Sequence, residues 1–208
     1  MIARFVHHTW MMDVSQVHQF LGPDLFMAAV FDAFSRMPLA VEVFPRPPKA
    51  WQMARLLRWV VGRLARPKYL ITDLGGEFTG EAFRKAVRRF GILQRFASKD
   101  NLYATARLER FWRTLKESAR LYRLGLPLTL ADLEERLAVA LFHYVCFRPH
   151  EGLQGATPHE AFFGLNPACR ETIEPPRGRP GEQSPRPPFA MRYLDPPGSR
   201  FPVLTSAA

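Results

Sequence analysis

The chain is poor in cysteine, has fewer acids than bases and contains no long apolar run, and each shortage argues against a class of protein. Its two cysteines, Cys146 and Cys169, are too few for a disulfide framework and stand in no metal-ligand spacing. The longest apolar run, around residues 25–31, is too short to span a bilayer. The N-terminus also lacks the charged, apolar and small-residue pattern of a signal peptide. We therefore expect a cytoplasmic protein without a membrane partner.

The charge balance favours a polyanionic partner. The 208 residues contain 29 Lys and Arg against 19 Asp and Glu, which gives a net charge of +10. Lys and Arg side chains set against phosphates release condensed counterions, so such a chain binds nucleic acid readily. Composition alone leaves DNA, RNA, ribosome and acidic membrane open. The hydrophobic content of 47% is ordinary for one domain with a real core.

Hydrophobic periodicity predicts five strands and several helices. Three strand-like runs, at residues 9–15, 25–32 and 38–44, are expected to form an antiparallel meander. A helix with one apolar face then leads to a fourth strand at residues 69–72, as in a βαβ unit. The apolar positions that predict this helix recur every three or four residues: Trp51, Ala54, Leu57, Val61 and Leu64.

The second half predicts a further helix at residues 80–90, a strand at 92–96 and two long helices. The first long helix covers about residues 103–116, and the second covers about 131–147 with an N-cap in residues 129–132. From Pro175 onward the composition changes, because nine of the 19 prolines fall there. We therefore predict an α/β domain at residues 1–170, with a mixed five-stranded sheet flanked by helices, and a flexible Pro/Arg-rich tail at 171–208.

Three acids occupy positions suited to a common site. Asp13 and Asp73 lie in or at the end of predicted strands with 59 residues between them, and Glu109 follows on a helix after 35 more. Ligand sites in parallel sheets gather at the carboxyl ends of strands. Carboxylate oxygens suit Mg²⁺ or Mn²⁺, and two such ions can promote an in-line displacement at phosphorus. The hypothesis is a two-metal phosphoryl-transfer site in which Asp13 is shared by both ions.

Simpler explanations exist for each of these residues. A single acid at a strand end is more often a turn residue than a ligand, and Glu109 could form an ordinary helix pair with Arg113. Arg113 and Lys116 share the Glu109 side of the helix and could contact DNA phosphates or take part in surface ion pairs. Other acids compete for the metal role: Asp32, Glu77 and Asp100.

Five ordered sequence blocks resemble the integrase catalytic core of DDE-type bacterial insertion-sequence transposases, in the superfamily that includes retroviral integrases. The similarity spans about residues 9–167, and the order of the blocks is more specific than any one of them. The blocks are Trp10-Met-Met-Asp13-Val-Ser15, Phe31-Asp-Ala-Phe-Ser-Arg36, Thr72-Asp73-Leu-Gly-Gly-Glu-Phe78, Leu108-Glu109-Arg-Phe-Trp-Arg-Thr-Leu-Lys116 and Arg148-Pro-His150 with Gly155-Ala-Thr-Pro158.

The resemblance implies an RNase H-like fold and a D,D-35-E triad at Asp13, Asp73 and Glu109. It implies two Mg²⁺ or Mn²⁺ ions and DNA strand transfer by a free 3′-hydroxyl, as in transposition, DNA integration and DNA recombination. It also suggests that Lys116 contacts DNA near the triad. The implied partners are transposon ends and target DNA, together with further copies of the chain in a transpososome at the bacterial nucleoid.

The chain departs from this pattern in two places. Related transposases usually carry a helix-turn-helix region before the core, so we expect that region in a separately encoded subunit. Alternatively, the chain is a catalytically silent remnant that binds DNA or a partner subunit. The helix before Arg148 usually carries a Tyr-Asn pair, whereas Tyr144 is followed here by Val145.

A third hypothesis is a hydrolytic nuclease of the same fold, which would be expected to have a fourth acid near the site.

Overall fold

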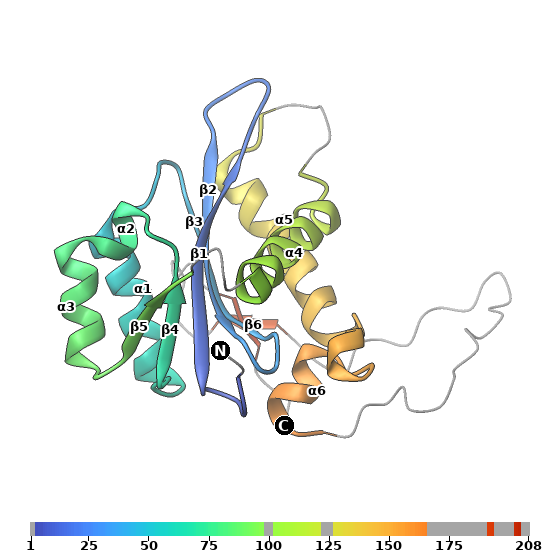
Figure 1. The fold of residues 1–208 in the computed structure, drawn as a ribbon. Helices are drawn as coiled ribbons and strands as arrows, with labels where there is room; N and C mark the ends of the chain where they lie inside the picture. The colour runs from blue at the N-terminus through green and yellow to red at the C-terminus, as the bar shows by residue number, and fades with distance from the viewer. Residues whose placement is uncertain (1–2, 98–101, 122–126, 166–190, 194–201, 205–208) are drawn as a thin grey trace, which may run out of the picture.

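A sheet lies between two groups of helices, with α1, α2 and α3 on one face and α4, α5 and α6 on the other (Figure 1). The computed structural model describes residues 3–97, 102–121, 127–165, 191–193 and 202–204, and only the backbone of 102–105 and of the last two segments. The helices are α1 Ala50–Arg63, α2 Gly76–Thr79, α3 Glu81–Arg89, α4 Leu102–Ser118, α5 Leu130–Cys146 and α6 Pro158–Phe163, with a 3-10 turn η1 Glu151–Leu153 before α6.

The main sheet is mixed and has five strands in the order β3-β2-β1-β4-β5. The pairs β1/β2 and β2/β3 are antiparallel, whereas β1/β4 and β4/β5 are parallel. The predicted meander followed by a helical crossover is thus confirmed. The strands are β1 Thr9–Val17, β2 Leu25–Asp32, β3 Pro38–Phe44, β4 Tyr69–Thr72 and β5 Leu93–Phe96.

Helix α1 packs on the sheet through a face that matches the predicted one in part: Ala54 and Leu57 are buried as predicted, and Val61 is partly buried against the core. Trp51 is 53% exposed and Leu64 is 43% exposed. At 100° per residue Trp51 points away from the stripe that meets the sheet, and Leu64 lies beyond the last helical residue. The predicted stripe begins at Trp51 and is therefore rotated about the helix axis from the stripe that is buried. The residues that α1 buries are Met53, Ala54, Leu56, Leu57 and Val60.

The two long helices form the opposite layer, as predicted. On α4 an apolar stripe is buried at Leu108, Phe111 and Leu115. The Phe111 ring lies between Phe31 of β2 and Tyr144 of α5, with centroid separations of 5.1 and 5.2 Å. Aromatic pairs at such distances contribute beyond their buried area. This stack therefore holds α4 against both the sheet and α5.

Helix α5 begins at the predicted cap. The Thr129 hydroxyl accepts the backbone N–H of Asp132, and the Asp132 carboxylate accepts the backbone N–H of Thr129 at 2.9 Å. This reciprocal capping satisfies two amides that the helix itself cannot pair.

Within the predicted tail, the described residues form two short strands, β6 Met191–Tyr193 and β7 Pro202–Leu204. They pair antiparallel with each other. The rest of residues 171–208 lies outside the described part of the chain. No helix in that described part is both long enough and apolar enough to cross a membrane.

The turn between β2 and β3 is organised by a buried acid. Asp32 is completely inaccessible to solvent. Its Oδ1 accepts the backbone N–H groups of Phe34 and Ser35 and the Ser35 hydroxyl, and its Oδ2 accepts the backbone N–H of His7 at 2.8 Å. Because four donors saturate this carboxylate, Asp32 is a structural residue and not a competing metal ligand.

Replacing Asp32 with alanine is expected to destabilise the fold by about 3 kcal/mol or more, because it leaves several buried donors without an acceptor. Urea denaturation would measure the loss. The matched control is Glu81→Gln, which neutralises an exposed carboxylate on α3 and should leave the free energy of unfolding nearly unchanged. An equally small effect of both substitutions would contradict the structural role of Asp32.

Candidate active site

Parallel pairing of β1 and β4 sets two of the predicted acids side by side. The ladder pairs Trp10 with Leu70 and Met11 with Ile71. The same offset, continued two residues further, brings Asp13 level with Asp73. Neighbouring strands are about 4.8 Å apart, and equivalent positions of parallel strands point to the same face. The two carboxylates therefore share one edge of the sheet although 59 residues separate them in sequence.

Asp13 lies in an environment that opposes its charge. The pKa of Asp13 is raised to about 6, mainly by burial and to a smaller extent by the nearby charges of Asp73 and Glu77, while hydrogen bonds from the Trp112 side chain and the Val14 backbone act in the opposite direction. Carboxylates with raised pKa values are typical of functional sites, because an added cation or proton relieves the unfavourable charge.

The loop after β4 brings a further acid to this edge. Asp73 is exposed, and its Oδ1 accepts the backbone N–H of Gly75 at 2.9 Å. A Cβ atom on Gly75 would lie 2.6 Å from Oε2 of Glu77, so the Glu77 carboxylate lies directly over this glycine. Gln94 of β5 donates to the Phe78 carbonyl at 3.1 Å and holds the end of the loop. Glu77 thereby lies near enough to Asp13 for its charge to raise the pKa of Asp13.

Helix α4 is fastened to β1 at the same place. The indole N–H of Trp112 donates to Oδ2 of Asp13 at 2.8 Å, and Nζ of Lys116 donates to the Gln16 carbonyl at 2.6 Å. Burial lowers the pKa of Lys116, and the charge of Asp13 partly offsets this effect. Trp112 therefore supports the Asp13 carboxylate directly, and Lys116, one turn later on α4, places a cation close to it.

Glu109 lies one turn before Trp112, on the side of α4 that faces β1. Its side chain is exposed, as is that of Arg113. The structure thus places Asp73 and Glu77 within electrostatic range of Asp13, and it places Glu109 on the helix that contacts Asp13 through Trp112. Among the described residues it records no hydrogen bond or ion pair for Glu109.

The chemistry of the acids fits a hard divalent cation. Carboxylate oxygens are the preferred ligands of Mg²⁺ and Mn²⁺, and the mutual repulsion around Asp13 would be relieved by positive charge. Among the side chains that the structure describes, no three His, Cys, Asp or Glu are close enough to form a metal-binding group. Completing a metal shell therefore requires the carboxylates to draw together.

Comparison with solved structures identifies the fold. The catalytic core domain of HTLV-2 integrase, in a structure in complex with magnesium, matches with a TM-score of 0.60 at 17% identity over 76% of this chain and 97% of that chain. The integrase core of BIV matches with a TM-score of 0.56 at 24% identity over 76% of this chain and 95% of that one. The chain has the RNase H-like fold of retroviral integrase catalytic cores.

Sequence comparison finds relatives of the same kind. The Pol polyprotein of Radiation murine leukemia virus (strain Kaplan) is 27% identical over 160 residues, and that of Feline endogenous virus ECE1 is 26% identical over 160 residues. The matches cover 76% of this chain but only 26% and 14% of the two polyproteins, so the chain spans a small part of these relatives. No protein-family model matches the chain.

Within this integrase-like fold, sequence reasoning missed the role of Trp112 and underrated Glu77. Trp112 is 5% exposed, as expected of a packing residue, but its indole N–H also donates to Asp13. Trp112 follows Glu109 by three residues, and this spacing places both side chains on the same side of the helix. Glu77 was seen only as a competitor, and its approach to Asp13 depends on the fold of the loop over Gly75.

The raised pKa of Asp13 predicts a pH-dependent stability in the absence of divalent ions. Folding raises this pKa from 3.8 to about 6, so the folded state holds the proton more tightly than the unfolded chain. The resulting stabilisation is complete below pH 3.8 and is lost as the pH rises through about 6. We expect Asp13→Asn, whose amide oxygen can still accept the Trp112 N–H, to be more stable than the unsubstituted chain above that pH by about 3 kcal/mol.

Urea denaturation over a pH series would measure this difference, with Glu135→Gln, an exposed carboxylate on α5, as the control. A stability difference for Asp13→Asn that stays constant with pH would contradict the assignment.

Proposed function

We propose that the chain is the catalytic core of a DNA transposase or integrase that performs metal-dependent strand transfer. The observation that carries this proposal is the alignment of Asp13 with Asp73 on parallel strands, with α4 fastened to Asp13 through Trp112. The likeness to retroviral integrase cores supports it. The five sequence blocks favour an insertion-sequence transposase acting at the bacterial nucleoid.

Asp13, Asp73 and Glu109 are proposed to form the triad and to hold two Mg²⁺ or Mn²⁺ ions. When bound, such ions activate the attacking oxygen and stabilise the leaving oxygen of an in-line displacement. Asp13 lies between the loop of Asp73 and helix α4, and it would be the acid shared by both ions. Trp112 orients the Asp13 carboxylate, and Asp73 is oriented by the Gly75 backbone N–H.

The reaction exchanges one phosphodiester for another. A free DNA 3′-hydroxyl oxygen forms a new bond to phosphorus and loses its proton, while the bond from phosphorus to the 3′-oxygen of the target strand breaks and that oxygen gains a proton. No covalent enzyme intermediate is required, because the protein positions the reacting groups. The acids of this chain serve by holding positive charge where negative charge develops.

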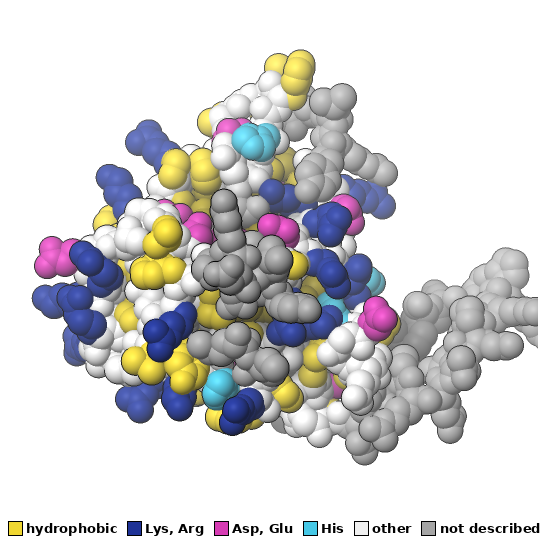
Figure 2. All heavy atoms as spheres, viewed as in Figure 1, with side chains coloured by type: hydrophobic (Ala, Val, Ile, Leu, Met, Phe, Trp, Pro, Cys, Tyr) yellow, Lys and Arg dark blue, Asp and Glu magenta, His cyan; other side chains and the backbone are white. Residues whose placement is uncertain are grey.

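DNA is the proposed substrate, as both transposon ends and target. Figure 2 shows Lys and Arg side chains spread over this face of the molecule, including α3 and the neighbourhood of α4 and α5. Arg113 is exposed beside Glu109 and is proposed to contact a phosphate directly. Lys116 donates here to the Gln16 carbonyl and would exchange that acceptor for DNA. Further copies of the chain are the proposed protein partners.

One observation favours a second candidate, a hydrolytic nuclease. Glu77 adds a further acid beside Asp13 and Asp73, and such an acid could help to activate water instead of a DNA hydroxyl. The products distinguish the two: a nuclease releases nicks, whereas a strand transferase yields joined DNA. A catalytically silent remnant would bind DNA and give neither.

The triad is tested by Asp73→Asn and Glu109→Gln in a strand-transfer assay with an oligonucleotide carrying the element's ends and Mg²⁺. Each substitution is expected to lower the rate at least about a hundredfold, because it removes a ligand whose charge is needed in the transition state. Glu81→Gln is the control and should retain full activity. Undiminished joining by Asp73→Asn would remove that residue from the proposal.

Metal binding has a readout that does not depend on activity. Mg²⁺ at about a hundredfold excess over its dissociation constant should stabilise the folded chain by about 2.7 kcal/mol, and a chelator should reverse the gain. Asp13→Asn should lose this stabilisation while keeping its fold. Equal gains for both proteins would show that the ions bind elsewhere.

A further inference from the structure

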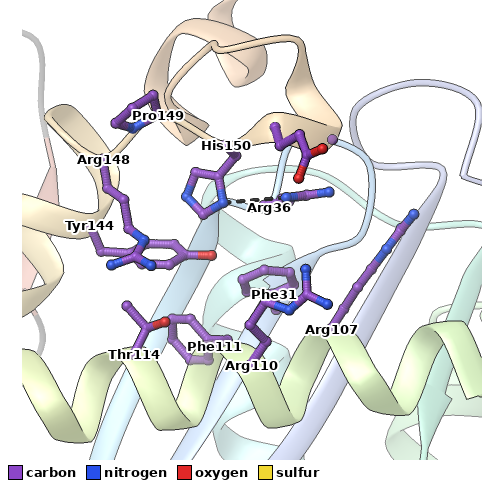
Figure 3. A pocket seen from close by; sticks show the side chains of 12 residues that line it. Phe31, Arg36, Arg107, Arg110, Phe111, Thr114, Tyr144, Arg148, Pro149 and His150 are labelled. Carbon is purple, nitrogen blue, oxygen red and sulfur yellow. Dashed lines mark hydrogen bonds between the residues drawn. The ribbon is translucent and has the colours of Figure 1, made fainter.

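A second polar site lies on the opposite side of α4 from the acids. It is a pocket of about 170 Å³ between α4, the end of α5, the η1 turn and the turn that joins β2 to β3 (Figure 3). Arg107, Arg110, Phe111 and Thr114 line it from α4. At 100° per residue these four positions lie on the flank away from Glu109 and Trp112, so the pocket is separate from the candidate active site.

The pocket concentrates positive charge that the protein leaves unbalanced. Four arginines line it, against the single carboxylate of Glu151, and they come from three different segments: Arg36, Arg107, Arg110 and Arg148. Burial lowers the pKa of Arg36, and the positive charge of Arg107 lowers it further. Among the described residues, no carboxylate forms an ion pair with any of the four. Like charges held together without a counterion favour the binding of an anion.

His150 supports one of these arginines. Its Nδ1 lies 3.3 Å from Nη1 of Arg36, and a guanidinium can only donate, so Nδ1 accepts and the ring proton resides on Nε2. Burial and the charges of Arg36 and Arg148 lower the pKa of His150 to about 4, which keeps the ring neutral at pH 7. The Nε2 atom is buried and has no hydrogen-bond partner among the described residues. His150 therefore contributes to the pocket through Nδ1, which accepts from Arg36 and helps to hold that guanidinium in place.

The pocket is built into the fold. Arg36 adopts a positive φ of 61° in the turn that Asp32 organises, which directs its side chain across the pocket toward His150. Gly152 makes room for it, because a Cβ there would lie 1.9 Å from Nη2 of Arg36. Tyr144 packs edge-on against His150 with ring centroids 4.9 Å apart. Arg107 is held by the Ala33 carbonyl at 3.0 Å. These contacts preorganise the cationic groups.

We propose that this pocket binds one phosphate group of the DNA backbone. The proposal rests on the proposed function, since it extends the path of the DNA beyond the acids. Guanidinium groups match phosphate oxygens in geometry as well as charge, and the pocket is large enough to admit a phosphate group. The exposed side of α4 carries Arg110 and Arg113 and connects the acids to the pocket. A strand that reacts at Asp13 can cross this side and place a neighbouring phosphate among the four arginines.

The test uses Arg148→Gln and Arg110→Gln, because both side chains are exposed and the structure records no hydrogen bond from either to a described residue. Binding of duplex DNA by the full chain is measured without divalent ions over a salt series. Each variant should bind about tenfold more weakly. The salt dependence of log K should fall by about 0.9 per lost phosphate contact. Arg58→Gln, an exposed arginine on α1 across the sheet, is the control for net charge and should change neither quantity.

Methylphosphonate substitution identifies the contact. A neutral methylphosphonate is placed at each backbone position in turn, and at one position it should weaken binding by the unsubstituted chain but not by Arg148→Gln. If every position affects both proteins equally, the pocket holds no backbone phosphate and the proposal is overturned. Failure of the chain to bind duplex DNA at low salt would also overturn it.

Inorganic phosphate is the other possible source of the anion. The Tm of the chain and of Arg148→Gln is measured in phosphate and in chloride at equal ionic strength. If phosphate raises only the Tm of the unsubstituted chain, and both proteins bind DNA with equal affinity, the pocket holds free phosphate and the DNA contact is overturned. These binding measurements involve no strand transfer. A chain that binds DNA through the pocket but never joins strands would contradict the proposed function and leave the phosphate site intact.

Discussion

The arrangement of this protein depends on the parallel pairing of β1 with β4. That ladder is short, yet its register alone determines that Asp13 and Asp73 meet at one edge of the sheet. A slip of one residue would turn one carboxylate to the opposite face. The buried surroundings of β1 prevent such a slip, because Trp10, Met11 and Met12 are almost fully enclosed by the core.

Helix α4 connects the two polar regions of the molecule. One flank presents Trp112 and Lys116 to β1, whereas the other presents Arg107 and Arg110 to the arginine pocket. Between them the buried stripe through Phe111 fixes the rotation of the helix about its axis. Because packing fixes that rotation, the side of α4 that faces Asp13 and the side that carries Arg107 and Arg110 stay opposite each other.

Asp32 and Asp13 are both carboxylates in buried surroundings, but their hydrogen-bond partners give them different roles. Asp32 is completely buried, but four donors saturate it, so its charge is used to hold a turn. Asp13 receives one side-chain hydrogen bond and lies near two other carboxylates, and its pKa is raised to about 6. A carboxylate left in this state stabilises the folded chain less than it could, which is typical of sites that bind or react.

The sequence by itself determined the order of the elements, the mixed five-stranded sheet and the positions of Asp13, Asp73 and Glu109 on strand, strand end and helix. Periodicity and turn residues are local properties, and they suffice for that. Tertiary structure alone decided which way α1 faces, that Trp112 supports Asp13, that Glu77 folds over Gly75 beside the acids, and that Arg36 and Arg148 meet in one pocket. Those relations join residues up to 112 positions apart, and no local pattern encodes a distance between segments that only packing brings together.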